Sequence, residues 1–281
     1  MSEQVFRVTY ATLSAENDEV HAAYDGGIVG ARELLGEEHP FYIDGRPRRG
    51  DGAREVVSPI DRDIVIGRFA QATAEDVAEA VDHARAFAST WAGTAWPERI
   101  AVLRRAADLI SERRNVLAAA MAFEVGKNRL EALGDVEESA DLIRYYCHQM
   151  EEHEGLASPM ERLSPAEVTT DVMRPYGVWA VISPFNFPMA LAAGPAGAAL
   201  VAGNTVVLKP STSGSLTALH LYEALRDAGL PAGAFQVITG SGPVAGAALT
   251  AHPGVDGITF TGSYAVGMDI YRTFSTVYPK P

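Results

Sequence analysis

Residues 178–188 read Val-Trp-Ala-Val-Ile-Ser-Pro-Phe-Asn-Phe-Pro, and this stretch decides the fold. Its first five residues are apolar and mostly β-prone, as in a buried strand. Ser183 and Pro184 end the strand, and Asn186 follows on a Pro-bounded corner. A Gly- and Ala-rich apolar run then predicts a buried helix that begins at Pro188. Open α/β sheets bind ligands where a strand end meets a helix start, although a purely structural turn would also explain this stretch by itself.

Downstream of this stretch, strand-like and helix-like segments alternate. The predicted strands are residues 178–182, 205–208, 235–238 and 257–260. The predicted helices are residues 188–202, 216–228 and 244–250, and a further one that starts at Ser263. Strands that alternate with helices at this spacing predict a parallel sheet with right-handed crossovers. The expected fold class is therefore α/β, a Rossmann-like parallel sheet with flanking helices.

Shorter elements precede the alternating region. Residues 1–38 are polar, and one short helix is expected near residues 30–36. Residues 41–43 and 55–57 are strand-like and flank Gly-containing turns, so they are expected to pair with each other. Residues 168–172 form a further predicted strand that could project from the main body.

Apolar residues at helical spacing predict four helices between these parts. Thr73 caps the first, Pro97 opens the second and Gly126 ends the third. The fourth covers residues 129–150 and places Cys147 on its inward face. We interpret Cys147 as a core thiol rather than a nucleophile, because no basic or helix-start setting faces it.

Composition narrows the class of protein. The chain has 281 residues and 47% hydrophobic content, enough for one large domain or two smaller ones. A net charge of -13 argues against a nucleic-acid partner. A single cysteine excludes an internal disulfide framework and fits a reducing, cytoplasmic compartment. The acidic N-terminal residues are not expected to form a signal peptide, and no apolar run reaches the roughly 20 residues that span a bilayer, so no membrane partner is expected. No metal is expected either.

Three further strand ends carry polar or small residues on the edge where Asn186 lies. Lys209 could reach a ribose or phosphate there, or be a solvated surface lysine. Gly240-Ser241-Gly242 would let a ligand approach the backbone, or be a plain loop. Thr261-Gly262-Ser263 opens a helix, whose free amides can bind phosphate. Four such ends on one sheet edge predict a dinucleotide site, although the G-x-G-x-x-G fingerprint is absent.

These motifs resemble the aldehyde dehydrogenase superfamily in order and spacing. The matching motifs are Pro184-Phe185-Asn186-Phe187-Pro188, Lys209-Pro210-Ser211, Gly240-Ser241-Gly242-Pro243 and Phe260-Thr261-Gly262-Ser263. The resemblance runs from about residue 41 to the end of the chain. Residues 123–128, Phe-Glu-Val-Gly-Lys-Asn, are similar to the L-glutamate γ-semialdehyde (1-pyrroline-5-carboxylate) dehydrogenases of proline catabolism.

The resemblance implies oxidation of an aldehyde to an acid with NAD(P)+. In the family, a cysteine thiolate attacks the aldehyde, hydride passes to the nicotinamide, and a glutamate activates water. Asn186 is implied as the catalytic oxyanion-hole side chain. Lys209 would hold the adenosine ribose, and Gly262 and Ser263 the pyrophosphate. The implied cofactor-binding residues are Ile182, Ser183, Pro184, Phe185, Lys209, Ser211, Thr212, Gly242, Gly246, Gly262, Ser263 and Val266.

NAD+ is the expected cofactor, with NADP+ as an alternative. Thr212 stands where many NAD-preferring relatives carry a glutamate that repels a 2′-phosphate.

The expected substrate is a small aldehyde, and a dehydrogenase for an aldehyde other than glutamate semialdehyde remains an alternative. Glu124 and Lys127 either face the substrate tunnel or lie at a solvated helix end.

The family's nucleophilic cysteine and water-activating glutamate lie beyond the region matched here. We therefore expect the catalytic domain to be absent, the chain being a fragment of a longer protein or a truncated product. The expected parts are an N-terminal arm with a strand pair, helices and a linker (1–166), a hairpin that in relatives helps oligomerisation (167–177), and the Rossmann-like sheet (178–281). A homo-oligomer is expected of the complete protein. The alternative is a catalytically inactive dinucleotide-binding or interaction module.

Overall fold

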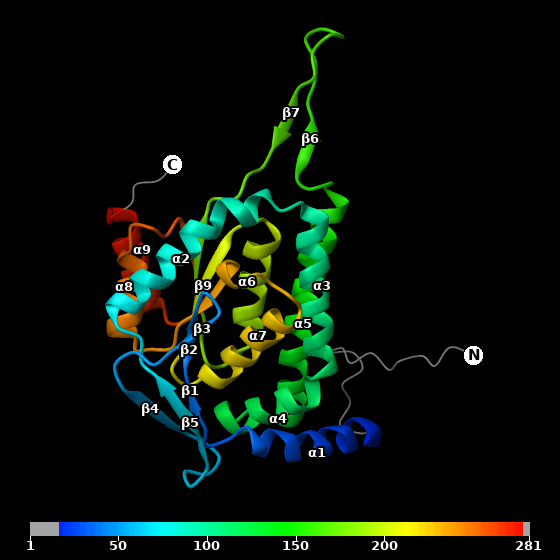
Figure 1. Ribbon diagram of the computed structural model, residues 1–281. Coiled ribbons are helices and arrows are strands. Elements are labelled where there is room, and N and C mark those ends of the chain that lie inside the picture. The colour runs from blue at the N-terminus through cyan, green and yellow to red at the C-terminus, as the bar shows by residue number, and fades with distance from the viewer. Residues whose placement is uncertain (1–16, 278–281) are drawn as a thin grey trace, which may run out of the picture.

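A computed structural model describes residues 17–277. Its centre is a six-stranded sheet in the order β11-β8-β9-β10-β2-β3 (Figure 1). These strands are β2 (Phe41–Ile43), β3 (Arg46–Arg48), β8 (Val178–Ile182), β9 (Thr205–Lys209), β10 (Phe235–Val237) and β11 (Gly257–Phe260). Strands β11, β8, β9 and β10 run parallel, and β2 and β3 continue the sheet antiparallel. The predicted α/β fold with a parallel sheet is confirmed, with a mixed edge that the sequence did not predict.

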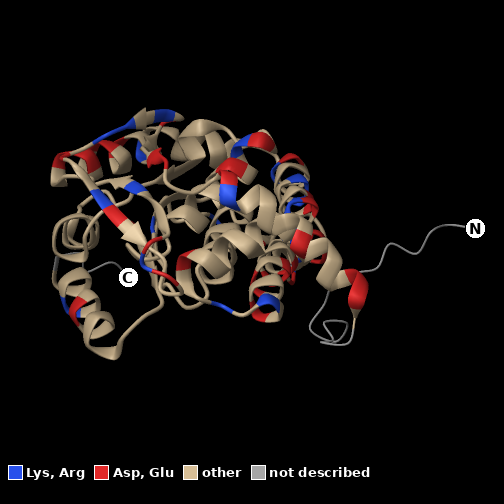
Figure 2. Cartoon of the chain, turned by 90° about the horizontal axis from the view of Figure 1, so that it is seen from below, with Lys and Arg blue, Asp and Glu red and all other residues tan. Residues whose placement is uncertain are grey.

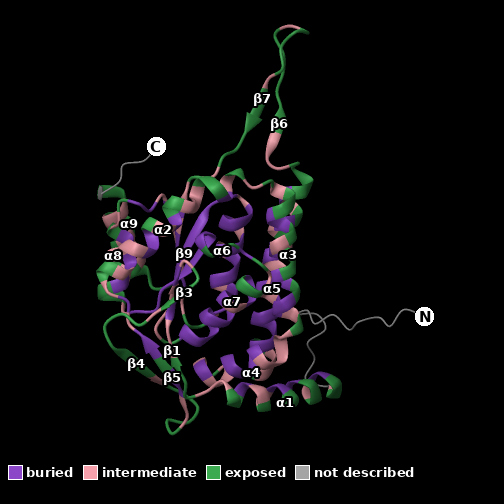
Figure 3. Cartoon of the chain, viewed as in Figure 1, coloured by how far each residue is buried: buried purple, intermediate pink, exposed green. Residues whose placement is uncertain are grey.

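Helices cover both faces of this sheet, because its side chains alternate between two cores. In β9, Val206 and Leu208 belong to the larger core and Val207 to the smaller one. The larger core lies beneath α3, α5, α6 and α7, and the smaller one beneath α2 and α8 (Figures 1 and 3). The helices are α1 (Asp18–Glu33), α2 (Ala74–Gly93), α3 (Trp96–Glu112), α4 (Arg114–Val125), α5 (Arg129–Glu152), α6 (Ala190–Val201), α7 (Ser215–Asp227), α8 (Ala247–Ala251) and α9 (Tyr264–Val277).

The helix boundaries follow local capping chemistry. Thr73 and Asp76 form a capping box at the start of α2, as the sequence predicted for Thr73. Gly126 ends α4 in the left-handed conformation with φ 75°. Helix α6 begins at Ala190 rather than at the predicted Pro188, since residues 188–189 still form a turn.

The N-terminal elements differ from the predicted ones. Helix α1 replaces the short helix expected near residues 30–36, and its first four residues Asp18–His21 follow an Asn17 cap. Residues 41–43 and 55–57 do not pair. Asp44 and Gly45 both have positive φ and form a two-residue turn, so β2 pairs directly with β3.

Residues 55–57 instead belong to a separate three-stranded sheet in the order β1-β5-β4. Its strands are β1 (Glu38–His39), β4 (Ala53–Val57) and β5 (Val65–Ala70). Strand β5 was not predicted. It supplies the antiparallel partner that β4 requires, so the strand pair expected from the sequence had the wrong partner.

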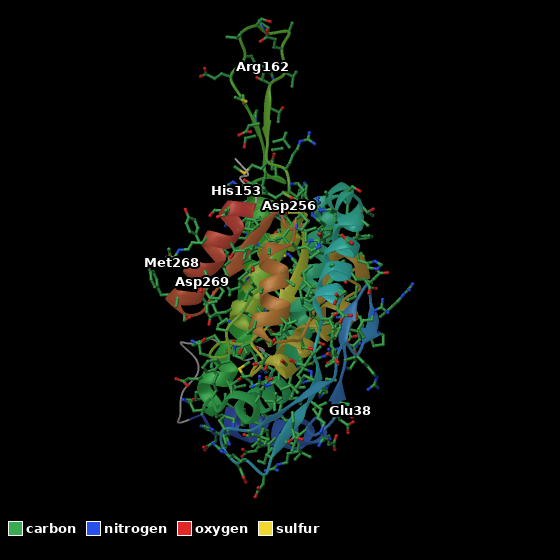
Figure 4. The ribbon with its side chains drawn as sticks, turned by 90° about the vertical axis from the view of Figure 1, so that its left-hand side faces the viewer. Glu38, His153, Arg162, Asp256, Met268 and Asp269 are labelled. Carbon is green, nitrogen blue, oxygen red and sulfur yellow. The ribbon has the colours of Figure 1, made fainter. Side chains whose placement is uncertain are left out.

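A hairpin of β6 (Ala157–Pro159) and β7 (Thr170–Val172) projects from the body (Figure 1). Figure 4 labels Arg162 near its tip. The projecting strand predicted at 168–172 is confirmed, but residues 157–159, interpreted as linker, form its partner strand. Leu163 is 97% exposed and Val168 80% exposed, so the hairpin carries apolar side chains outside either core.

Helices α5 and α6 approach closely because α6 presents glycine to its neighbour. A Cβ atom on Gly194 would lie 2.9 Å from Leu142 Cδ1, and one on Gly197 would lie 2.9 Å from Ile143 Cγ1. The middle of α6 is therefore packed directly against the second half of α5. Charged side chains of both signs are spread over the helices seen from below (Figure 2). Within residues 17–277, no helix combines the length and the hydropathy that crossing a membrane requires.

Glycine 257 provides a test of how β11 is seated. A Cβ atom there would overlap the Trp179 ring, whose Nε1 donates a hydrogen bond of 2.7 Å to Thr259 Oγ1. Gly257→Ala should lower the free energy of unfolding by about 1–3 kcal/mol, because the ring cannot move without losing that bond. The matched control is Gly26→Ala in α1, where nothing lies within 4 Å and a small stabilisation is expected. Chemical denaturation of both variants checks this, and equal effects would contradict it.

Candidate functional site

The carboxyl ends of β8, β9 and β11 meet through backbone hydrogen bonds. Ser183 N–H donates to Lys209 O at 3.2 Å, and Ser211 N–H donates to Ser183 O at 2.9 Å. Thr261 N–H donates to Ile182 O at 3.1 Å. The parallel register, in which Ile182 pairs with Lys209, fixes these ends side by side. Ile238 N–H, just after β10, donates to Leu208 O at 2.9 Å, so each of the four strand ends expected to form one site is joined to a neighbouring strand.

Lys209 is buried, with 5% of its surface exposed, so its interpretation as a solvated surface lysine is wrong. Its Nζ donates a hydrogen bond of 2.8 Å to Pro210 O. Burial lowers the pKa of the Lys209 ammonium to about 8, because the charged form loses water. A buried ammonium of this kind gains stability when a ligand supplies further acceptors.

The surroundings of Lys209 fit a ligand rich in hydroxyl and phosphate oxygens. A Cβ atom on Gly246 would lie 3.5 Å from Lys209 Cε, so a larger side chain would fill the space beside the lysine stem. Ser183 is 3% exposed, and its hydroxyl has no hydrogen-bond partner among residues 17–277. The Lys209 ammonium, the unpaired Ser183 hydroxyl and the space that Gly246 leaves are compatible with the predicted dinucleotide.

The remaining predicted cofactor residues lie in the segments that follow β10 and β11. Gly242 begins a π-helical turn, Gly242–Gly246, that leads into α8. Gly262 and Ser263 precede α9 and are exposed, and Ser263 Oγ accepts a hydrogen bond from Val266 N–H at 3.4 Å. Val266 is 48% exposed on the first turn of α9.

Two predicted residues lie on the loop that follows β9. Ser211 and Thr212 are half-buried there, and their carbonyl oxygens accept from Ser215 Oγ. Ser211 and Thr212 follow Lys209 by two and three residues in the sequence.

Asn186 occupies an exposed corner between β8 and α6. Its side chain makes no hydrogen bond within residues 17–277, and its neighbour Phe185 is 54% exposed. Pro184 is half-buried, and its carbonyl oxygen lies beside Gly214 at the start of α7. The amide of Asn186 is therefore available to a ligand at the same edge as Lys209.

Sequence reasoning missed what lies behind this corner. Asp135 of α5 is fully buried and accepts a hydrogen bond of 2.7 Å from Ala190 N–H, the first residue of α6. Lys127 Nζ lies 2.8 Å from the other Asp135 oxygen and 3.3 Å from the centroid of the Phe187 ring. Lys127 is thus neither at a solvated helix end nor free in a tunnel.

Glu124 is also placed differently from both of its interpretations. It is 2% exposed and accepts hydrogen bonds from Leu216 N–H at 2.7 Å and Thr217 N–H at 3.0 Å. It therefore caps α7 from a distant helix, where Gly214 has no side chain to do so. Burial raises the pKa of the Glu124 carboxyl, and these hydrogen bonds oppose the rise.

Cys147 lies in the larger core and is fully buried. Burial raises the pKa of its thiol to about 11, which keeps it protonated at neutral pH. Its interpretation as a core thiol is confirmed. Among residues 17–277, no group of three or more His, Cys, Asp or Glu side chains could hold a metal ion.

Residues 47–280 match the model of the aldehyde dehydrogenase family. The chain belongs to this family. The match includes the β8, β9 and β11 strand ends and the loops that follow them.

Within the aldehyde dehydrogenases, the chain is similar to 1-pyrroline-5-carboxylate dehydrogenases. It is 36% identical over 258 residues to that of Anoxybacillus flavithermus, covering 92% of this chain and 50% of the relative. It is 39% identical over 246 residues to that of Geobacillus thermodenitrificans, covering 87% and 47%. The chain therefore spans about half the length of the curated relatives it matches.

A solved structure of a protein with the same name has the same fold as this chain. The 1-pyrroline-5-carboxylate dehydrogenase from Thermus with bound NAD superimposes with a TM-score of 0.90 at 29% identity, covering 99% of this chain and 54% of that one. The cofactor domain of the family is thus the fold seen here, and nicotinamide dinucleotide binding is a property of the family.

Lys209→Met should raise the free energy of unfolding in a pH-dependent way. The folded-state pKa of about 8 lies below the ordinary 10.5, so between these values the unfolded chain binds a proton that the folded chain does not. Wild-type stability therefore rises with pH across this window. The gain from Met is up to about 3 kcal/mol below pH 8 and shrinks towards pH 10.5. Urea denaturation of wild type and Lys209→Met at several pH values measures the difference in their free energies of unfolding. A gain that does not change with pH would show that the pKa of Lys209 is not lowered in the folded protein.

Proposed function

We propose that this chain forms the cofactor-binding portion of an NAD(P)-dependent aldehyde dehydrogenase that oxidises L-glutamate γ-semialdehyde to L-glutamate in proline degradation. The observation that carries the proposal is the sheet edge where the buried Lys209 and the exposed Asn186 lie on adjacent strand ends of a family member. One side chain suits a ribose or phosphate, and the other suits a reacting carbonyl oxygen.

Each part of the edge has a role in holding the dinucleotide. Lys209 would donate to the adenosine ribose, with Ser211 and Thr212 beside it. The loops at Gly242 and Gly262 would accommodate phosphates, Ser263 would add a hydroxyl, and Val266 would border the adenine. Residues 182–185 would line the cleft, and Gly246 would leave room next to Lys209. When bound, the dinucleotide accepts the hydride that leaves the aldehyde carbon.

Asn186 would stabilise the negative charge that develops on the aldehyde oxygen. Its amide is exposed and unused by the described protein, so it can donate without first breaking another bond. A fixed donor aimed at a developing oxyanion lowers the barrier because the charge exists chiefly in the transition state.

The substrate assignment is supported by the relatives, whose names specify 1-pyrroline-5-carboxylate.

The oxidation also needs a thiolate nucleophile. Cys147 cannot supply it, because the thiol is buried and protonated. The alternative function is a non-catalytic dinucleotide-binding module. NAD+ binding without oxidation of any aldehyde by the protein that contains this chain would establish the alternative.

The hairpin and the thiol support two further parts of the proposal. Exposed apolar residues such as Leu163 and Val168 on a projecting hairpin suit contact between copies in a homo-oligomer. The single cysteine, a free thiol, suits the reducing cytoplasm.

Asn186→Ala tests the proposed chemistry. With L-glutamate γ-semialdehyde and NAD+, kcat should fall on the order of 100- to 1000-fold, because a transition-state donor is lost. The dissociation constant for NAD+ should stay nearly unchanged. Steady-state kinetics and calorimetric titration measure the two effects. An unchanged kcat with weaker NAD+ binding would make Asn186 a cleft-lining residue instead.

Thr212→Glu tests cofactor choice. The wild type should prefer NAD+ with measurable NADP+ use, since neutral hydroxyls and Lys209 tolerate a 2′-phosphate. A carboxylate at 212 would repel that phosphate, so the ratio of NAD+ to NADP+ affinity should increase. Titration of both dinucleotides into wild type, Thr212→Glu and Thr212→Gln separates charge from size. If wild type rejects NADP+ as strongly as Thr212→Glu does, the discrimination lies elsewhere.

A further inference from the structure

One buried ion pair holds the corner that carries Asn186 at two points. The Asp135 side chain is completely buried and the Lys127 side chain is 8% exposed, with 2.8 Å between Nζ and Oδ2. Lys127 comes from the loop between α4 and α5, and Asp135 from the second turn of α5. Both are far from Asn186 in sequence.

The first attachment is at the start of α6. Asp135 Oδ1 accepts the hydrogen bond from Ala190 N–H at 2.7 Å, a short distance typical of charged acceptors. Helix α6 has no side-chain cap of its own, so this carboxylate serves as its cap. The attachment lies four residues after Asn186.

The second attachment is at the residue next to Asn186. Lys127 Nζ lies 3.3 Å from the centroid of the Phe187 ring, over its face. A cation held there by Asp135 fixes the ring, and an aromatic side chain held at its face restricts the backbone that carries it. On its other side the corner meets α7, because a Cβ on Gly214 would lie 3.1 Å from Pro188 Cβ.

Lysine is rare in the described part of the chain. Residues 17–277 contain two lysines, Lys127 and Lys209, and both side chains are buried. All other side-chain cations that are permanently charged there are arginines. A compact ammonium fits between a carboxylate and a ring face where the planar arginine group would need more room. Buried ion pairs add little net stability, so geometry is the better explanation for this one.

We infer that Lys127 and Asp135 are positioning residues for Asn186, fixing residues 186–190 so that the amide meets the developing oxyanion. The inference rests on the proposed function for its catalytic consequence. It makes a structural claim of its own as well, that the ion pair sets the rigidity of the corner.

The test uses three variants and a matched control. Lys127→Met removes the cation at similar length, and Lys127→Arg keeps a cation. Asp135→Asn keeps an oxygen for Ala190 N–H but removes the charge. The control, Glu137→Gln, removes the charge of another buried α5 carboxylate, one that accepts from Ser111 Oγ at 2.9 Å and does not contact the corner.

Two readouts are needed. Hydrogen exchange of the peptide covering residues 184–191 reports the corner directly in this chain. Exchange there should become at least tenfold faster in Lys127→Met and Asp135→Asn, and stay at the wild-type rate in Glu137→Gln. In the dehydrogenase, kcat should fall by up to about 100-fold in the first two, with KM for NAD+ within twofold, because a displaced donor is a weaker one. Lys127→Arg keeps the charge but needs more room, so it should recover only part of both effects.

The outcomes separate the two proposals. If Lys127→Met and Asp135→Asn lose thermal stability as Glu137→Gln does, but leave exchange at 184–191 and kcat unchanged, the pair is merely structural and the inference is overturned. If Asp135→Asn does not fold, Lys127→Met against Lys127→Arg decides the question by the same readouts. If the wild-type protein oxidises no aldehyde, the proposed function fails, while faster exchange at 184–191 in Lys127→Met still supports the positioning role.

Discussion

The parallel pairing of β8 with β9 is the constraint on which the rest of the structure depends. Parallel neighbours enter the sheet from the same end, so each needs a crossover, and α6 provides the one between these two. The loops after the parallel strands β8, β9, β10 and β11 then fall on one edge. Lys209 and Asn186 lie at the same edge of the sheet for this reason, one at the end of β9 and the other in the loop after β8.

Two buried carboxylates, Asp135 and Glu124, cap the first turns of two helices from elsewhere in the chain. Helices α6 and α7 both begin at the sheet edge with no side chain of their own to satisfy the first amides. Asp135 and Glu124 supply the missing acceptors from α5 and α4. Each bond joins a helix of the alternating region to a helix of the N-terminal region. The two halves of the described chain are therefore connected where the loops after β8 and β9 lead into α6 and α7.

Sequence periodicity predicted the elements that obey local rules. Thr73, Gly126 and the strand at 178–182 could be placed because capping, left-handed glycine and apolar runs act over a few residues. The partner of β4 could not, since strand pairing depends on which edge is free after folding. The roles of Glu124 and Lys127 were missed for the same reason. Their partners, Leu216 and Phe187, are distant in sequence, and a charged residue after an apolar helix ordinarily faces solvent. The roles of the dinucleotide residues depend on a ligand and stay predictions.

The mixed edge of the main sheet has a consequence for how the chain is made. Strand β2 pairs with β10 through Tyr42 and Val237. A ribosome releases the chain from its N-terminus, so residues 41–48 emerge long before residues 235–237 exist. Through that interval the backbone edge of β2 that later pairs with β10 has no partner strand, although α2, which packs in the same core as Phe41 and Ile43, is made soon after them. The β2 edge is therefore a strand edge that stays unpaired until residues 235–237 have been made, and unpaired edges of this kind are open to pairing with other chains.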